Sequence, residues 1–129
     1  MSLSDEAIDR INSTSYEQMV DDLAKPGQAI VDGMNAKAAH ILHMSIGIAG
    51  EAGELLDAIK KHVIYGKDLD VENVIEELGD LEFYMEGLRA ALYLSRKEIL
   101  MANKVKLLGK RYASGTYSDD QAKGRADKE

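Results

Sequence analysis

Apolar residues recur along most of this chain at intervals of three and four positions, the period of an amphipathic helix. No segment alternates apolar and polar residues as a half-buried strand does, and the chain contains one proline. Alanine, leucine, glutamate and lysine, which favour helices, are abundant. The pattern therefore predicts an all-α fold without internal repeats.

Turn and capping signals divide this pattern into four helical segments. Ser15 and Ser95 each precede a Gln or Glu by three residues, the spacing of a capping box at a helix start. The four predicted segments are about 16–25, from near 30 to about 64, about 71–94, and from Ser95 to about Tyr112. Their short connections predict a four-helix bundle-like fold with the two long helices antiparallel.

The chain length of 129 residues fits one domain. We expect a single all-α domain over residues 1–112, in which residues 1–39 form an N-terminal helical extension. Residues 113–129 form a C-terminal tail rich in Gly, Ser, Asp and Lys. This tail is either disordered or laid along a partner.

The long helix carries two neighbouring stripes. One is typical of a core: Ile41, Met44, Ile48, Ala52, Leu55, Leu56, Ile59 and Val63. The other combines His, Gly and Glu: His40, His43, Gly47, Gly50, Glu51, Glu54, Ala58 and Lys61. Each Gly within a helix costs roughly 0.8–1 kcal/mol relative to Ala. We therefore expect something to approach the backbone closely at these glycines, either a ligand or a closely packed helix.

The next helix places a carboxylate inside its apolar arc. The arc consists of Val74, Leu81, Met85, Leu88 and Leu92. Glu77 falls only about 60° from its centre and Asp80 lies on its flank, whereas Glu76, Glu82 and Glu86 point away. An unpaired charge is costly to bury, so Glu77 requires a cation.

Folding the two long helices back through a turn near Lys67 brings two acidic pairs to one level. Glu54 and Glu77 stand 13 and 10 residues from Lys67, and Glu51 and Asp80 stand 16 and 13 residues away. At about 1.5 Å per residue the pairs differ by less than one turn. Four converging carboxylates suit Mg²⁺ or Mn²⁺, and the absence of His from both pairs disfavours zinc and di-iron. Solvated surface glutamates are the alternative.

Donors for phosphate oxygens occur on the last helix. Asn103, Lys106 and Lys110 share a face that could close over the carboxylates, or could instead be a solvated lysine face. His43 is a weaker ligand candidate, and Asp57 with Lys61 is expected to form a surface ion pair.

Composition narrows the function classes. The formal net charge is −7, from 16 basic and 23 acidic residues, so we expect no nucleic-acid partner. The chain has no cysteine, which removes disulfides, thiolate chemistry and Cys-type zinc sites. We see neither a signal peptide nor a membrane span and expect a cytoplasmic protein without membrane contact.

The segment from His43 to Tyr84 resembles the MazG-like family of all-α nucleoside triphosphate pyrophosphohydrolases. That family carries Glu-x-x-Glu, a spacer and Glu-x-x-Asp, matched here by Glu51-Ala-Gly-Glu54, 22 residues, and Glu77-Leu-Gly-Asp80. The resemblance extends over roughly residues 40–125: Asn103, Lys106 and the Lys110-Arg111-Tyr112 run are similar to a phosphate-contacting final helix, and the tail to tails of bacterial and phage members. Phe83, preceded by Glu82, departs from the apolar residues common there.

The resemblance implies Mg²⁺-dependent hydrolysis of (deoxy)nucleoside triphosphates between the α and β phosphates, with Mn²⁺ as a substitute. It implies that Glu51, Glu54, Glu77 and Asp80 hold the metal and that Glu51 or Glu54 activates water. The implied substrate-binding residues are Asn103, Lys106, Lys110 and Arg111, and His43 and Lys61 are further candidates from the stripe on the long helix. Base specificity stays open between dUTP, dGTP or GTP, and a broad house-cleaning range.

Family members form dimers or tetramers, and this sequence is compatible with a homodimer or homotetramer. Each long helix has two apolar faces, and the Leu92–Leu94 run adds surface that a monomer would struggle to bury. Two other classes stay open: a non-catalytic helical protein-interaction module, and a carboxylate-bridged redox bundle, which the missing Glu-x-x-His disfavours.

Overall fold

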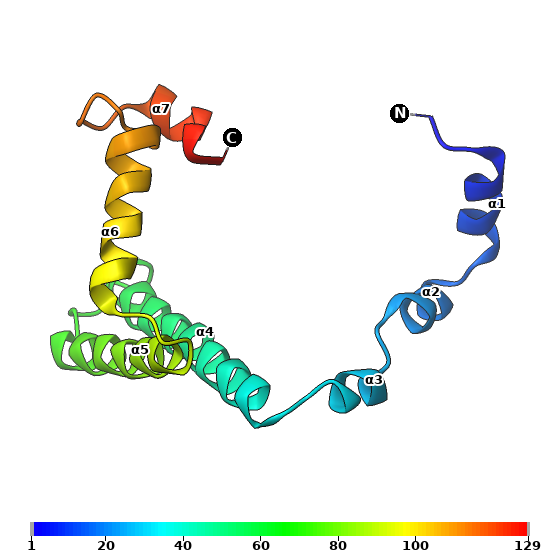
Figure 1. Cartoon of the computed structure of the whole chain (residues 1–129), viewed down its shortest axis with the longest axis horizontal. Helices are drawn as coiled ribbons and strands as arrows, with labels where there is room; N and C mark the ends of the chain where they lie inside the picture. Colours follow the sequence, from blue (N-terminus) through cyan, green and yellow to red (C-terminus); the bar gives the residue numbers. More distant parts are fainter. Residues whose placement is uncertain (1, 129) are drawn as a thin grey trace. The chain divides into compact units, whose positions relative to one another are not determined.

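The computed structural model describes residues 2–128, and these form helices and turns without a strand. Figure 1 shows the helices in chain order. The chain divides into two units, one ending at Asn35 and the other beginning at Ala36. The all-α class predicted from the helical periodicity is confirmed. None of the helices within residues 2–128 has the length and apolar content needed to cross a membrane.

Two long helices organise the second unit, α4 (Ala36–Val63) and α5 (Val71–Ala91). They lie side by side and antiparallel, as predicted, and a short turn joins them (Figure 1). Gly66 has a φ of +67° in this turn, and the ring Nδ1 of His62 donates to the carbonyl oxygen of Lys67 at 2.7 Å. Asp70 then caps α5 by accepting a hydrogen bond from the backbone N–H of Asn73.

Two glycines bring these helices close together. The ring of Tyr84 lies against the backbone of Gly47, and the Met44 thioether lies against Gly87. A β-carbon at either position would collide with the side chain that lies there. Met44 is accordingly 5% exposed, and α4 packs on α5 through its glycine-bearing side.

This contact corrects the predicted core of α4. Ala58, predicted beside the core, is 6% exposed, whereas Leu56 and Val63, predicted within it, are 68% and 66% exposed. The physical reason is that the Tyr84 ring fits against α4 only where position 47 carries no side chain. The side of α4 that carries Gly47 therefore faces α5. On α5 the predicted arc is partly buried from Val74 to Leu88, but its last member, Leu92, lies beyond the helix and is 41% exposed.

The next helix, α6 (Arg96–Lys106), begins with the predicted capping box. The Ser95 side chain accepts from the Glu98 N–H, and the Glu98 carboxylate accepts from the Ser95 N–H. The helix continues as one π-helical segment, η1 (Leu107–Arg111). No residue of α6 is buried, and α6 leaves the hairpin rather than lying along it (Figure 1). Within this unit, the helix predicted from Ser95 to about Tyr112 therefore does not pack along the hairpin of α4 and α5, and Tyr93, with a φ of +57°, lies at the turn between α5 and α6.

The tail after Ala113 folds back on its own chain. It forms α7 (Asp119–Gly124) and a 3₁₀ turn, η2 (Ala126–Lys128). The two carboxylate oxygens of Asp127 accept hydrogen bonds from the guanidinium of Arg111 at 2.6 and 2.7 Å. The sequence left disorder and a partner contact open for this tail. In the described part of the tail, the chain instead folds back onto η1, because the Asp127 carboxylate pairs with the guanidinium of Arg111.

The first unit contains three short helices, α1 (Asp5–Ser13), α2 (Tyr16–Leu23) and α3 (Gly27–Asp32). Ser4 and Ser15 cap α1 and α2 through their side chains. Only α2 was predicted. Because the helical structure is interrupted between α3 and Ala36, the long helix begins six residues later than the expected start near residue 30.

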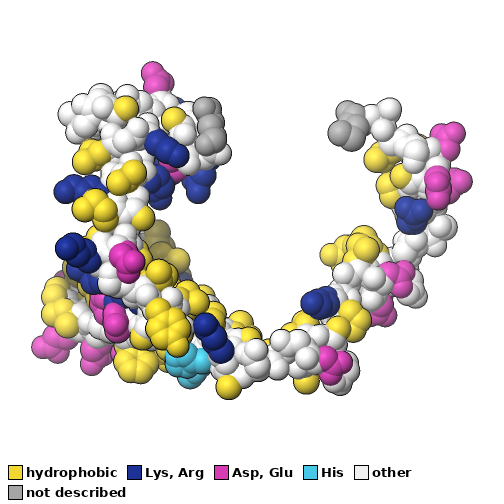
Figure 2. Space-filling view, in the orientation of Figure 1, with side chains coloured by type: hydrophobic (Ala, Val, Ile, Leu, Met, Phe, Trp, Pro, Cys, Tyr) yellow, Lys and Arg dark blue, Asp and Glu magenta, His cyan; other side chains and the backbone are white. Residues whose placement is uncertain are grey.

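Much apolar surface stays uncovered. Many large apolar side chains of the chain are exposed, among them Tyr16, Leu56 and Phe83. Figure 2 shows hydrophobic side chains spread over its visible face. On α4 the exposed apolar residues follow a spacing of four and three: Leu42, Ile46, Ala49, Gly53, Leu56 and Val63. The long helix thus has a second apolar face, as the sequence predicted.

Candidate metal centre

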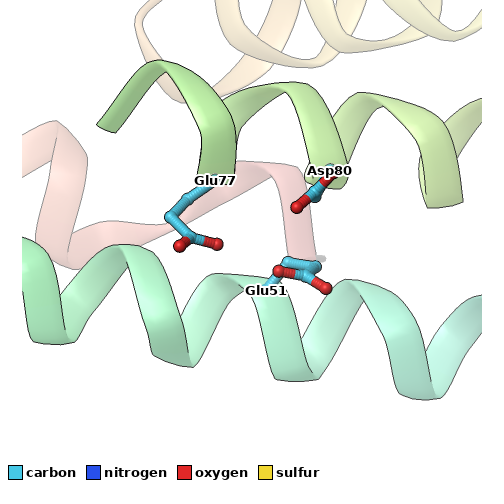
Figure 3. A group of neighbouring side chains, drawn as sticks. All are labelled: Glu51, Glu77 and Asp80. Atoms are coloured by element: carbon cyan, nitrogen blue, oxygen red, sulfur yellow. The ribbon is translucent and has the colours of Figure 1, made fainter. Parts of the chain in front are cut away.

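Three carboxylates from α4 and α5 meet between the two helices. Glu51, Glu77 and Asp80 each offer an oxygen, and these oxygens lie within 4.8 Å of one another. Figure 3 shows Glu77 and Asp80 on α5 pointing toward Glu51 on α4. Glu77 and Asp80 are three residues apart and so share a helix face. The antiparallel turn brings Glu51 to their level.

Glu54, the fourth predicted ligand, lies beside this group without joining the three. It is exposed and lies three residues after Glu51 on α4, near Glu77. Its negative charge acts directly on the Glu77 carboxyl. The structure therefore places all four predicted carboxylates at one locality and brings three of them into mutual reach.

Glu77 is the unusual member of the group, because its side chain is buried with only 8% of the residue exposed. Among the described residues, the buried oxygens that lack a hydrogen-bond partner are Oε2 of Glu51 and Oε2 of Glu77. A buried carboxylate oxygen without a partner is strongly unfavourable. A cation bound by these two oxygens would offset that cost.

The electrostatics of Glu77 agree with its burial. Burial raises the pKa of Glu77 from 4.5 to about 7, and the neighbouring carboxylates of Glu51 and Glu54 add to the rise. At neutral pH the Glu77 carboxyl is thus held partly protonated by its neighbours. A divalent cation among the same carboxylates would replace that proton.

The donor set fits a hard divalent cation. Carboxylate oxygens without His or Cys are the ligands of Mg²⁺ and Mn²⁺. With Mg²⁺–O bonds of about 2.0–2.1 Å, adjacent ligands of an octahedral ion lie about 3 Å apart and opposite ligands about 4.2 Å apart. The three oxygens, which lie within 4.8 Å of one another, would move closer together to bind one ion.

A polar cleft of about 460 Å³ opens beside the carboxylates. Its lining residues come from α4 and α5: Gly50, Gly53, Glu54, Asp57, Lys61, Asn73 and Glu77. This volume falls in the range of small-molecule sites, roughly 300–1,000 Å³. Glu77 belongs to both the acidic group and the cleft, so a ligand in the cleft would reach the carboxylates.

The glycines of α4 separate into two kinds. Gly47 is covered by Tyr84, which is the close helix packing that the sequence left open. A β-carbon at Gly50 or Gly53 would meet no atom within 4 Å. At these two positions the α4 backbone is open toward the cleft, where a ligand could approach it.

Two predicted substrate residues lie on α4. Lys61 lines the cleft, and its ammonium group forms an ion pair of 2.9 Å with Asp57, which confirms the predicted surface pair. His43 is exposed and packs edge-on against Tyr84, with 6.1 Å between the ring centroids. Lys61 is therefore positioned to contact a ligand in the cleft, whereas His43 does not line it.

The predicted phosphate-binding residues of the last helix do not line the cleft of the same chain. Asn103 and Lys106 lie on α6, and Lys110 lies on η1. The guanidinium of Arg111 is held by Asp127, whose side chain is fully buried. One copy of the chain therefore does not assemble these residues at the acidic group.

Asn73 is a cleft residue that the sequence reasoning missed. It lies four residues before Glu77 on α5, and this helical spacing could have identified it. Tyr84 was missed as the partner of Gly47, although a glycine in mid-helix signals close approach of a large side chain.

Comparison with known proteins adds no relative: the sequence matches no protein-family model, and searches of curated proteins and of solved structures returned no match.

Proposed function

We propose that this chain is a Mg²⁺-dependent nucleoside triphosphate pyrophosphohydrolase with a MazG-like fold. It hydrolyses the bond between the α and β phosphates and releases a nucleoside monophosphate and pyrophosphate. The observation that carries the proposal is the buried carboxylate of Glu77, whose Oε2 has no hydrogen-bond partner and which lies among three further carboxylates at the edge of a polar cleft. A structural role explains neither the burial nor the cleft.

Each carboxylate has a role in this proposal. Glu51, Glu77 and Asp80, with Glu54 beside them, would hold Mg²⁺, for which Mn²⁺ can substitute. When bound, the cation would offset the negative charge of the triphosphate and the charge that develops during in-line displacement. Glu54 is exposed in the cleft and accepts the proton of the attacking water, with Glu51 as the alternative.

The phosphate contacts come from cationic and amide side chains. Lys61 lines the cleft and reaches the ligand directly. Asn103, Lys106 and Lys110 donate to phosphate oxygens from the α6 of a second copy, because their own helix leaves the hairpin. Arg111 supports this surface indirectly by tying the tail to η1. The active form is accordingly a homodimer or homotetramer, and the exposed stripe of α4 supports such an assembly.

Pyrophosphate release from the canonical ribonucleoside and deoxynucleoside triphosphates, with Mg²⁺ and with a chelator, tests the proposal and defines the base specificity. Glu54→Gln and Asp80→Asn are expected to abolish turnover while leaving the helical circular dichroism unchanged. Glu76→Gln, an exposed neighbour of Glu77, serves as the control and retains turnover. Retained Mg²⁺-dependent release by both site variants would remove the assignment.

A helical protein-interaction module is the second candidate, and the exposed apolar stripe of α4 favours it. Such a module has no use for the acidic group and shows no rise in Tm with Mg²⁺ or Mn²⁺. A carboxylate-bridged redox bundle instead binds iron and develops a visible absorption band. Metal titration followed by Tm and absorbance therefore separates the three classes.

A further inference from the structure

The cleft beside the acidic group has two chemically different ends. Glu54, Glu77 and the open backbones of Gly50 and Gly53 form one end, and Asp57, Lys61 and Asn73 form the other. Asp57 follows Glu54 by three residues on α4, and Asn73 precedes Glu77 by four on α5. Because the two helices are antiparallel (Figure 1), both displacements point toward the turn that joins them. At about 1.5 Å per residue they amount to about 4.5–6 Å. Asp57, Lys61 and Asn73 are therefore the turn end of the cleft.

The turn end supplies hydrogen-bond donors. The ammonium group of Lys61 carries three N–H donors, and the amide of Asn73 carries two. None of the described residues that line the cleft is aromatic or has a large apolar side chain. Protein sites hold nucleobases by stacking them on aromatic and apolar side chains. Donors without such a stacking surface suit phosphate oxygens better than a nucleobase.

The ion pair at the turn end is easily exchanged for another anion. Nζ of Lys61 lies 2.9 Å from Oδ2 of Asp57, and Nζ of Lys60 lies 3.5 Å from Oδ1 of the same carboxylate. All three side chains are about half exposed, so water screens both pairs and each contributes little. Side chains of a helix lean toward its N-terminus, so Lys61 extends toward the acidic end of the cleft. A phosphate in the cleft can therefore reach the Lys61 ammonium and replace Asp57 as its partner.

We propose that Lys61 and Asn73 bind the β- and γ-phosphates of the triphosphate, and that Asp57 competes with the released pyrophosphate for Lys61. The inference rests on the proposed function, because hydrolysis at the acidic group leaves pyrophosphate at the turn end. The α-phosphate then lies at the carboxylates, and the nucleoside extends away from the turn. Lys61 and Asn73 touch the substrate, whereas Asp57 is a positioning residue that acts on the phosphates through Lys61.

This arrangement gives the turn end two effects on the reaction. A triphosphate whose α-phosphate lies at the carboxylates brings two phosphates to the turn end, whereas a diphosphate brings one. The subsite therefore favours triphosphates over diphosphates. After hydrolysis, Asp57 recovers the Lys61 ammonium, which lowers the affinity for pyrophosphate and accelerates its release.

Calorimetric titration of the full chain with inorganic pyrophosphate in the presence of Mg²⁺ tests the subsite. Lys61→Gln is expected to raise the Kd at least about tenfold, because it removes charge-assisted hydrogen bonds to phosphate. Lys60→Gln is the matched control: it removes the same charge and also breaks an ion pair with Asp57, but Lys60 does not line the cleft. Its Kd should stay within about twofold of that of the natural chain.

Two further variants test the other members of the turn end. Asn73→Ala keeps the backbone hydrogen bond to Asp70 and should raise the Kd several-fold. Asp57→Asn should lower the Kd about two- to fivefold, the range for the loss of an exposed competing ion pair. The same variant should show stronger inhibition of turnover by pyrophosphate. A purely structural role of the Asp57 pair predicts no tighter binding.

Several results would overturn the inference. These are a natural chain that does not bind pyrophosphate with Mg²⁺, equal affinities in Lys61→Gln and Lys60→Gln, and weaker binding in Asp57→Asn. A changed base preference in Lys61→Gln with unchanged pyrophosphate affinity would also overturn it, by placing the nucleoside at the turn end.

The response to Mg²⁺ alone separates this inference from the proposed function. The rise in Tm with Mg²⁺ reports on the acidic group and is expected to persist in Lys61→Gln. A natural chain without triphosphate hydrolysis but with Lys61-dependent binding of pyrophosphate would contradict the proposed function and retain the subsite. A natural chain with hydrolysis but with pyrophosphate affinity independent of Lys61 would do the reverse.

Discussion

The ring of Tyr84 on α5 occupies the space that a side chain at position 47 of α4 would need. This contact lies one helical turn from the acidic group on both helices, because Glu51 follows Gly47 by four residues and Asp80 precedes Tyr84 by four. The approach of the ring to the bare backbone therefore sets the distance across which the carboxylates face one another. Packing and the candidate metal centre depend on the same missing β-carbon.

Gly47→Ala is expected to destabilise the fold by about 1–3 kcal/mol, the range for overpacking a close contact. The added methyl group displaces Tyr84 and separates α4 from α5 near Glu51. Urea denaturation measures the loss. Gly79→Ala is the matched control, because a β-carbon there meets no atom within 4 Å, and it should stabilise α5 by about 0.5–1 kcal/mol. Equal effects of the two substitutions would show that the Tyr84 contact does not set the helix distance.

Glu77→Gln is expected to raise the Tm of the metal-free protein at pH 8. A neutral amide of nearly the same shape removes the unfavourable buried charge, while the cleft keeps its form. The same variant should lose the rise in Tm that Mg²⁺ produces in the natural chain. Glu76→Gln changes the same charge at an exposed position and should preserve both properties. A Mg²⁺ response that survives in Glu77→Gln would place the cation elsewhere.

The shifted pKa of Glu77 also predicts a pH dependence of stability. The pKa is about 7 in the folded chain and 4.5 at its ordinary value, so the folded state binds this proton more tightly. The stabilising contribution is complete below pH 4.5 and is lost as the pH rises through 7. Because Mg²⁺ competes with the proton, its effect on Tm should grow from pH 5 to pH 8. Thermal denaturation at several pH values measures both trends, and a Mg²⁺ effect that is equal at pH 5 and pH 8 would contradict them.

Local sequence signals were sufficient for the hairpin and its acidic group. The 3.6-residue period, the caps at Asp70 and Ser95, and the residue count from the turn require only helix geometry. That count predicted that Glu51, Glu54, Glu77 and Asp80 lie at one level, and the structure brings Glu51, Glu77 and Asp80 into mutual reach. The same reasoning placed Glu77 among apolar neighbours, because the angular position on a helix follows from the residue number.

Features that depend on contacts between distant parts of the chain, or on an unusual backbone angle, could not be predicted in the same way. Leu56 was predicted to be buried but is exposed, and Ala58 is buried instead. The reason is that Tyr84, a residue distant in sequence, determines which face of α4 packs on α5. The direction of α6 follows from a positive φ at Tyr93. A positive φ can be expected from sequence where the residue is glycine or asparagine, but not where it is tyrosine. Neither outcome is encoded in the periodicity of a single helix.

The tail contact between Arg111 and Asp127 is expected to depend on the charge of Asp127. The two hydrogen bonds from Arg111 lower the pKa of Asp127 from 3.8 to about 2, so the stability from this contact is complete above pH 3.8 and is lost as the pH falls through 2. Asp127→Asn keeps the shape and removes the charge. It should free α7 and accelerate trypsin cleavage after Lys123 several-fold.

The hairpin of α4 and α5 does not share this contact, so the Tm should change little in the same variant. Asp120→Asn removes an exposed carboxylate from the same tail and should leave the cleavage rate near that of the natural chain. Equal cleavage rates for the two variants would show that Asp127 does not hold the tail. Arg111→Lys offers a sharper comparison, because a lysine cannot make the paired hydrogen bonds of a guanidinium, and its cleavage rate should approach that of Asp127→Asn.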